Sequence, residues 1–202
     1  MTRKNIPNAR SRILQAAVKI FARKSFEGSR IEEIAQEASV PKSLIYYHFK
    51  SKEDMFEVLI QGFINEYTEL IHASEEDTHA KKAQDIPDRL NSIYDFAQKN
   101  SDLVRIMLID SLKKSEEKPV IYKIVEALAE KEQKQSGLRS AGNYDRDERL
   151  VAEFFTSIIP NCAYLCFCDS WTKYFGIEKE AFDELFLKVI TSTHGAYHKY
   201  HE

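Results

Sequence analysis

Residues 29–49 read SRIEEIAQEASVPKSLIYYHF, a stretch that predicts two short helices joined by a tight turn. Ser29 and Glu32 fit the S-x-x-E capping box, which opens a first helix of about 10 residues. A turn at Ser39 follows, and a second helix begins at Pro41, where the missing N–H costs nothing. Two short helices joined by a turn of three or four residues have the helix-turn-helix geometry.

The second helix has two different faces. Ile45 and Phe49 form its inner face, and no acidic residue occurs between Lys42 and Lys52. The outer face offers hydrogen-bond donors and aromatic rings, as a recognition helix does. For the tyrosines the alternative is packing, and for the histidine and the flanking lysines it is ordinary solvation. The outer residues are Lys42, Ser43, Tyr46, Tyr47 and His48.

The charge is divided unevenly along the chain. The formal net charge of the 202 residues is −3. Residues 1–52 carry 11 Lys and Arg against 4 Asp and Glu, a net of +7, so residues 53–202 carry 18 against 28, a net of −10. Such an asymmetry predicts a local anion-binding surface on an acidic body.

The remainder of the chain is predicted to be helical. Apolar residues recur at helical spacing throughout, and only 6 Gly and 5 Pro occur, too few for the frequent turns of a sandwich or barrel. Long helices are expected over about 52–74, 147–174 and 178–199, and Pro160 should kink or split the second of these. Residues 75–86 and 136–146 are predicted as loops.

Several functional classes find no support in the composition. Three cysteines, Cys162, Cys166 and Cys168, are an odd number, which argues for a reducing cytoplasm and no disulfide framework. Their C-x3-C-x-C spacing favours core packing over a metal site or thiol sensor. The apolar run from Leu150 to Cys168 contains Pro160 and polar residues, so a buried helix is expected, not a membrane span. No catalytic motif, cofactor motif or signal peptide is visible.

The stretch FEGSRIEEIAQEASVPKSLIYYHFKSKEDMF, residues 26–56, resembles the DNA-binding signature of the TetR family of transcriptional regulators. The I-x-x-I-A pair and the K-x-x-I-Y-Y-H-F-K-S-K-E-D segment carry the resemblance, which covers roughly residues 10–60. It implies an all-α protein of about nine helices. It also implies two domains: a helix-turn-helix domain at 1–52, and a helical effector-binding and dimerisation domain at 53–202.

The resemblance also implies roles for individual residues. Lys42 and Ser43 would approach base edges and phosphates, and Tyr46, Tyr47 and His48 would touch the sugar–phosphate backbone. Arg30 is a further candidate contact. Lys52 would meet a phosphate at the start of the long helix, where the helix dipole favours an anion.

Four positions depart from the family pattern. The family usually has glycine at the positions of Ser25, Ser39 and Ser43, and often has threonine at the position of Leu44. Where the backbone is left-handed, a residue other than glycine costs about 1 kcal/mol. These departures leave the fold expectation intact and leave the base contacts open.

The acidic body is expected to hold a ligand pocket and a dimer interface. Apolar and aromatic lining suits a hydrophobic or aromatic effector, and broad apolar stripes on the last two helices suit a four-helix interface between two subunits. The alternative for every pocket residue is solid core. Candidate pocket residues are Phe63, Tyr67, Phe96, Met107, Tyr122, Phe155 and Cys162. Candidate interface residues are Phe154, Ile158, Phe182, Leu185, Phe186, Val189 and Ile190.

Together these features predict a cytoplasmic, homodimeric regulator, most simply a repressor, which binds a near-palindromic double-stranded DNA operator and is released by a small effector. No metal, cofactor or membrane is expected as a partner. The alternative is a DNA-bound protein that recruits or blocks a protein partner and has no small-molecule effector. A ligand-sized void in the body would favour the first hypothesis, and a solid core with an exposed apolar patch the second.

Overall fold

The computed structural model describes residues 8–76, 95–113, 119–128 and 146–201, and the regular structure in these ranges is helical. The expectation of an all-α chain with about nine helices is therefore confirmed. The predicted loops at 75–86 and 136–146 fall almost entirely outside the described residues. The elements are α1 (Ala9–Gly28), α2 (Ile31–Glu37), α3 (Lys42–His48), α4 (Lys52–Glu76), α6 (Ser101–Lys113), α8 (Arg146–Ala152), the π-helix η2 (Glu153–Ile158), α9 (Ile159–Phe175) and α10 (Lys179–His201), with further helical residues at 95–99 and 122–128.

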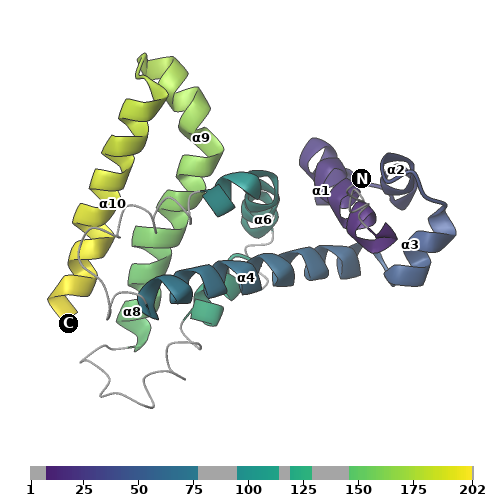
Figure 1. Cartoon of the computed structure of the whole chain (residues 1–202), viewed down its shortest axis with the longest axis horizontal. Coiled ribbons are helices and arrows are strands. Elements are labelled where there is room, and N and C mark those ends of the chain that lie inside the picture. The colour runs from purple at the N-terminus through teal and green to yellow at the C-terminus, as the bar shows by residue number, and fades with distance from the viewer. Residues whose placement is uncertain (1–7, 77–94, 114–118, 129–145, 202) are drawn as a thin grey trace, which may run out of the picture.

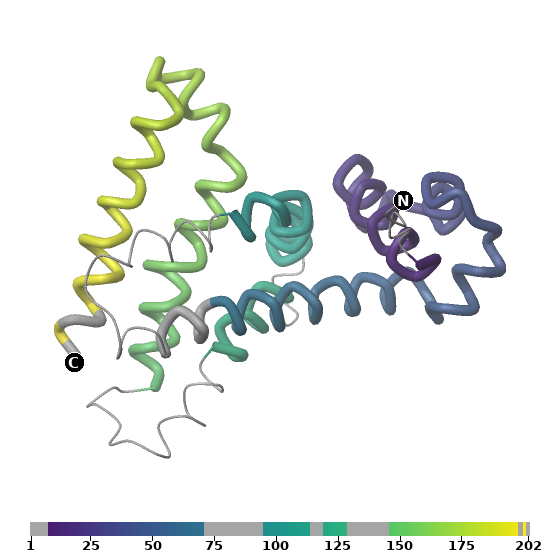
Figure 2. Tube along the Cα trace, viewed as in Figure 1, coloured from purple at the N-terminus to yellow at the C-terminus, as the bar shows by residue number. Residues whose placement is uncertain are grey.

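The helices form two groups joined by α4. Helices α1, α2 and α3 cluster at one end of the molecule, and α9 and α10 form a long hairpin at the other (Figure 1). Helix α4 runs from the first group into the second, and α6 lies between them, as the Cα trace in Figure 2 also shows. Because α4 begins at Lys52, the expected domain boundary at residue 52 coincides with the start of this connecting helix.

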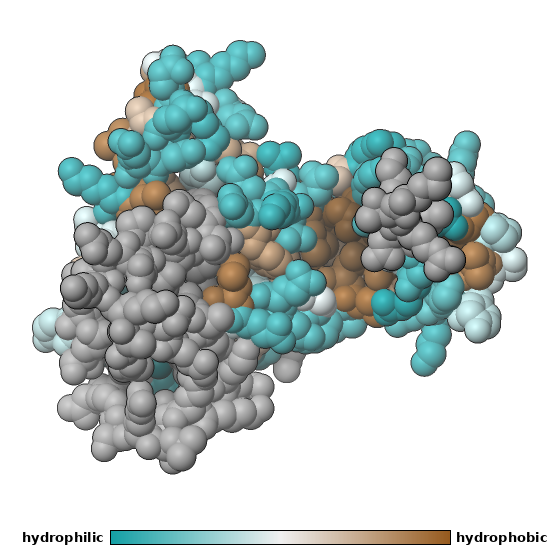
Figure 3. Space-filling model, in the orientation of Figure 1, coloured by the Kyte–Doolittle hydropathy of each residue, from teal (hydrophilic) through white to brown (hydrophobic). Residues whose placement is uncertain are grey.

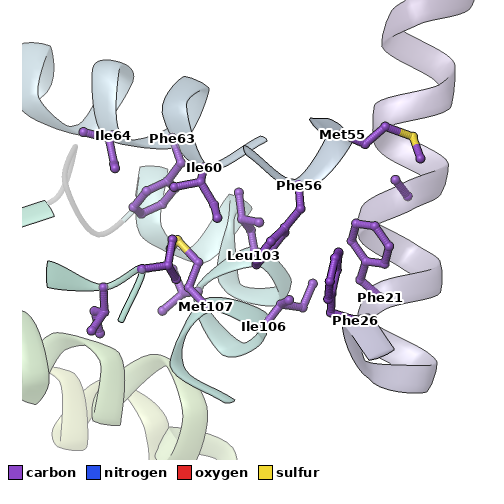
Figure 4. Close-up of a cluster of buried hydrophobic side chains, with 14 of the residues drawn as sticks. Phe21, Phe26, Met55, Phe56, Ile60, Phe63, Ile64, Leu103, Ile106 and Met107 are labelled. Carbon is purple, nitrogen blue, oxygen red and sulfur yellow. The ribbon is translucent and has the colours of Figure 1, made fainter. Parts of the chain in front are cut away.

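An aromatic cluster fastens the two groups together. Phe56 on α4 stacks on Phe26 of α1, with ring centroids 4.8 Å apart, and meets Phe21 edge-on at 6.0 Å. Ile106 of α6 is buried beside them (Figure 4). Such pairs add about 0.5–1.5 kcal/mol each beyond the area they bury. The helix-turn-helix group is thus held to α4 and α6 by apolar packing.

Helix α2 begins one residue later than the capping-box pattern predicts. Arg30 is its N-cap, and the Arg30 N–H donates to the Glu33 carboxylate at 3.2 Å. The hydroxyl of Ser29 instead donates to the carbonyl oxygens of Ser25 and Ile20, at 2.5 and 3.3 Å. The hydroxyl of Ser29 is therefore bonded to carbonyl oxygens of α1 and does not cap α2.

Pro160 changes the form of its helix without ending it. The residues just before it form the π-helix η2, and helix resumes as α9 with Pro160 in its first turn. Proline lacks an N–H, and its ring collides with the carbonyl of the fourth residue before it. A π-type turn, which moves the hydrogen-bond partner back by one residue, accommodates this defect. The continuous helix therefore spans Arg146–Phe175.

This long helix is more exposed than the sequence suggested. By length and composition alone it could cross a membrane, and only 28 % of its most apolar window is buried in the chain. The sequence analysis predicted a buried helix, and that prediction is correct for only the smaller part of this window. Hydrophobic residues are visible among hydrophilic ones on the α9–α10 hairpin in Figure 3.

Candidate nucleic-acid interface

Helices α2 and α3 form the predicted helix-turn-helix. The turn between them is closed by a hydrogen bond from the Val40 N–H to the Ala35 carbonyl at 3.0 Å, and Ser39 has a left-handed φ of 53°. Ile34 of α2 and Ile45 of α3 are completely buried. The inner face therefore anchors α3 to the rest of the domain, which fixes the direction in which its outer face points.

The outer face of α3 is exposed, as the sequence predicts. Lys42, Ser43 and Tyr46 are open to solvent, and Tyr47 has 80 % of its surface accessible. His48 is half-buried against the ring of Tyr47, with centroids 5.0 Å apart. This arrangement brings the five predicted contact residues of α3 onto one end of the molecule.

Glu32, which the sequence analysis assigned only to a capping box, lies beside this face. Glu32 of α2 accepts a hydrogen bond from the Lys42 ammonium, which also lies 5.6 Å from the Tyr46 ring centroid. This bond raises the pKa of Lys42 and lowers the pKa of the Glu32 carboxyl. The interface is therefore not free of acids. Glu32 precedes Lys42 by ten positions in the sequence, and the packing of α2 against α3 places its carboxylate beside the Lys42 ammonium.

Arg30 and Lys52 differ in their accessibility. Arg30 lies at the exposed start of α2. Lys52 is half-buried at the start of α4, and its ammonium donates to the carbonyl oxygens of Phe26 and Ser29 at 2.6 and 3.2 Å. The structure thus leaves the Arg30 side chain open to a nucleic acid and directs the Lys52 side chain into the protein.

Four of the seven predicted pocket residues line one small cavity in the body. Phe63, Tyr67, Met107 and Cys162 line a cavity of about 30 Å³ between α4, α6 and α9. Burial raises the pKa of the Tyr67 hydroxyl and raises that of the Cys162 thiol to about 12. A void of this size holds a water molecule or so and no drug-sized ligand.

The other three predicted pocket residues lie elsewhere. The Phe96 ring packs against Phe63 at 5.3 Å without lining the cavity. Tyr122 and Phe155 are 48 % and 63 % exposed and are also absent from its lining. Phe155 lies within η2, where the changed helical period alters which side chains face the body.

The predicted interface residues divide into buried and exposed sets. Ile158 is buried in the body, and Phe154 packs edge-on against Tyr122 at 5.2 Å. Phe182 and Phe186 pack against Tyr164 of α9, whereas Leu185 and Val189 are more than half exposed and Ile190 is half-buried.

At the apex of the hairpin, α9 and α10 enclose an open apolar groove of about 560 Å³. Aromatic side chains from both helices dominate its walls. They include Tyr164, Phe167, Trp171, Tyr174, Phe175 and Phe182.

Among the described residues, no cluster of three or more His, Cys, Asp or Glu side chains could hold a metal ion. Burial raises the pKa of each of the three cysteine thiols, which is the environment of unreactive packing residues.

Comparison with known proteins assigns the N-terminal domain. Residues 13–59 match the sequence model described as bacterial regulatory proteins, tetR family. Over 110 residues the chain is 33 % identical to the HTH-type transcriptional repressor NicS of Pseudomonas putida, a match that covers 51 % of this chain and 48 % of that repressor. The chain spans about half the length of the curated relatives it matches.

Solved structures extend the likeness in fold to nearly the whole chain. The fatty acid degradation regulator FadR from Bacillus halodurans superposes with a TM-score of 0.60 at 19 % identity, covering 92 % of this chain and 97 % of that one. A TetR-like transcriptional regulator from Rhodococcus superposes with a TM-score of 0.57 at 14 % identity, covering 92 % and 96 %. Residues 13–59, which include the helix-turn-helix, therefore carry the N-terminal domain of the tetR family of bacterial regulatory proteins, and the all-helical body shares the fold of the solved regulators named above.

Proposed function

We propose that this protein is a cytoplasmic, homodimeric repressor that binds a near-palindromic DNA operator and is released by a small hydrophobic or aromatic effector. The observation that carries the proposal is the exposed outer face of α3 above a fully buried inner face. The likeness to the repressor NicS over 110 residues supports the direction of regulation.

The proposed DNA contacts follow from exposure and chemistry. Lys42 and Ser43, at the N-terminal end of α3, reach base edges in the major groove, where an ammonium group reads guanine acceptors. Tyr46, Tyr47 and His48 donate hydrogen bonds to phosphate oxygens and fix the register of the helix. Before Lys42 can contact DNA it exchanges its bond with Glu32 for one with the operator.

Exposed apolar surface on the hairpin supports the homodimer. Leu185 and Val189 of α10, and Phe155 and Phe167 on the preceding long helix, are each more than half exposed. Exposed apolar side chains that gather on one element often mark a protein–protein interface. Pairing of two hairpins as four helices buries it and places two recognition helices about 34–36 Å apart, one turn of DNA.

The small volume of the cavity in the body suggests how an effector could act. A ligand of ordinary size needs a pocket of about 300–1,000 Å³, so binding in the 30 Å³ cavity must push its walls apart. Phe63 and Tyr67, which line that cavity, belong to α4. Movement of α4 would change the separation of the recognition helices, and the ligand shifts the equilibrium because it binds the widened state better.

A second candidate function is favoured by one observation. The body cavity is small, whereas the exposed aromatic groove at the hairpin apex has a volume of about 560 Å³. A DNA-bound protein that recruits or blocks a protein partner through this groove needs no small-molecule effector. The two candidates differ in whether any small molecule releases the protein from its operator.

The first test is selection of genomic DNA fragments by the purified protein, followed by gel-shift titration of the selected operator. Lys42→Ala and Tyr46→Ala should each weaken binding at least tenfold while the dimer keeps its melting temperature. Lys99→Ala, which removes an exposed lysine of the body, serves as the matched control. Unchanged affinity in both α3 variants would refute the assignment of this face.

The effector is sought among compounds related to the genes beside the operator. A hydrophobic or aromatic compound that releases the operator supports the first candidate. Recovery of the operator with no such compound, together with a protein that binds only the DNA-bound form, supports the second.

A further inference from the structure

The ammonium group of Lys52 sits in a cage of backbone carbonyl oxygens. Its Nζ donates to the carbonyls of Phe26 at 2.6 Å, Ser29 at 3.2 Å and Glu27 at 3.4 Å. The same nitrogen lies 4.5 Å from the centroid of the Phe26 ring. A lysine ammonium has three donors, and here three acceptors and an aromatic face surround it.

These carbonyls are held in place by the end of α1. Ser25 has a left-handed φ of 62°, which interrupts the helix, and α1 ends at Gly28. The buried hydroxyl of Ser29 donates to the carbonyls of Ser25 and Ile20 and so fixes the turn. The C-terminal carbonyls of a helix carry partial negative charge, which explains why a cation occupies this position.

Lys52 also lies where the recognition helix α3 joins the long helix α4. Helix α3 ends at His48, and only three residues separate it from Lys52, the first residue of α4. One of these, Phe49, is buried under the Arg10 guanidinium, 5.3 Å from its ring centroid. The bonds from Lys52 to residues 26–29 therefore fix where the recognition helix joins α4 relative to the α1–α2 junction.

Helix α6 of the body also contacts the end of α1. Lys113, the last residue of α6, forms an ion pair with Glu27 at 3.1 Å. A backbone hydrogen bond and the hydrogen bond from Lys113 lower the pKa of the Glu27 carboxyl, so this carboxylate is ionised at neutral pH. Residues 26–29 are thus held by α4 through Lys52 and by α6 through Lys113.

We propose that Lys52 is a positioning residue that sets the orientation of the recognition helix through residues 26–29, and that it is not a DNA phosphate contact. This inference rests on the proposed operator binding. A phosphate contact would require Lys52 to leave three short-range acceptors and a ring face. The bonds instead make Lys52 the point at which a shift of α4 reaches α1 and α2 directly.

The test compares Lys52→Met with Lys50→Met in operator titrations at several salt concentrations. Lys50 is exposed on the same short linker, so its variant removes the same charge without removing the carbonyl bonds. A phosphate contact contributes about 0.9 to the slope of log K against log salt, or about 1.8 for the two subunits. We expect Lys52→Met to bind at least tenfold more weakly than the wild type with an unchanged slope, and Lys50→Met to show how much affinity the removal of one charge on this linker costs.

Two results would overturn the proposal. A slope that is smaller in magnitude than that of the wild type by about 1.8 identifies Lys52 as a phosphate contact. Unchanged affinity with a lower melting temperature identifies a purely structural role. If Lys52→Met does not fold, Lys52→Arg decides, because arginine binds phosphate at least as well as lysine but presents a planar fork to the carbonyl cage. A positioning role predicts that this variant binds the operator more weakly than the wild type. A phosphate contact predicts that its affinity is not reduced.

The wild-type titration separates this inference from the proposed function. If the wild-type protein binds no selected duplex in a salt-dependent manner, operator binding itself fails. If the wild type binds and the Lys52 variants follow one of the two overturning patterns, only the positioning role fails.

Discussion

Replacement of Ser25 by glycine should stabilise the protein. Ser25 has φ 62° and ψ 166°, a region that residues other than glycine occupy at a cost of about 1–3 kcal/mol. Glycine removes this strain but gives the unfolded chain more freedom, which takes back about 0.4–1 kcal/mol. The net gain is about 1 kcal/mol, which for a chain of this length raises the melting temperature by about 2–4 °C.

The matched control for this substitution is Ser43→Gly. Ser43 lies in the first turn of α3 with helical backbone, where glycine is disfavoured by about 0.5–1 kcal/mol. Circular dichroism melts at equal protomer concentration should therefore shift in opposite directions for the two variants. A lower melting temperature for Ser25→Gly, or shifts of the same sign in both variants, would refute the reasoning from backbone strain.

Three further outcomes are expected. Phe56→Ala empties the aromatic cluster between α1 and α4 and should lower the free energy of unfolding by about 3–5 kcal/mol in urea denaturation, whereas a loss below about 1 kcal/mol would contradict the packing described. Cys162, whose pKa is raised to about 12, should stay protonated below that pH and resist iodoacetamide at pH 8 in the folded protein, as mass spectrometry can show by comparison with the less buried Cys166. Its labelling becomes fast only in urea, or as the pH approaches 12. Leu185→Glu should halve the molar mass measured by light scattering if the α10 face pairs two subunits, and an unchanged dimer would exclude this residue from the interface.

The helix-turn-helix was predictable because its signals are local. The buried positions of Ile34 and Ile45 follow from their spacing, and the exposure of Tyr46 and Tyr47 follows from the opposite face of the same short helix. Helix α4 also begins and ends within two residues of its prediction, since its apolar stripe is long and regular. In each case a periodic pattern within one segment carries the information.

The features that were not predicted depend on contacts between segments. The acceptors of Lys52 are backbone carbonyls 23–26 residues away, and no side-chain pattern reports where a carbonyl points. Glu32 reaches Lys42 only because the turn folds α2 against α3. Apolar spacing also cannot separate core from subunit interface, so Ile158 and Leu185 were grouped together although one is buried and the other exposed.

The π-helix η2 makes the length of the long helix as important as its composition. Each residue of an α-helix advances the direction of its side chains by about 100°. The π-type turn of η2 holds one residue more than an α-helical turn, so deletion of one residue within Glu153–Ile158 lets this segment become α-helical and leaves α9 in register with α8. Deletion of one residue from the α-helical part after Pro160 has no such compensation and rotates the rest of α9 by about 100° relative to the body. The π-helix is therefore the one place in this long helix where the loss of a residue leaves the inner and outer faces of the hairpin unchanged.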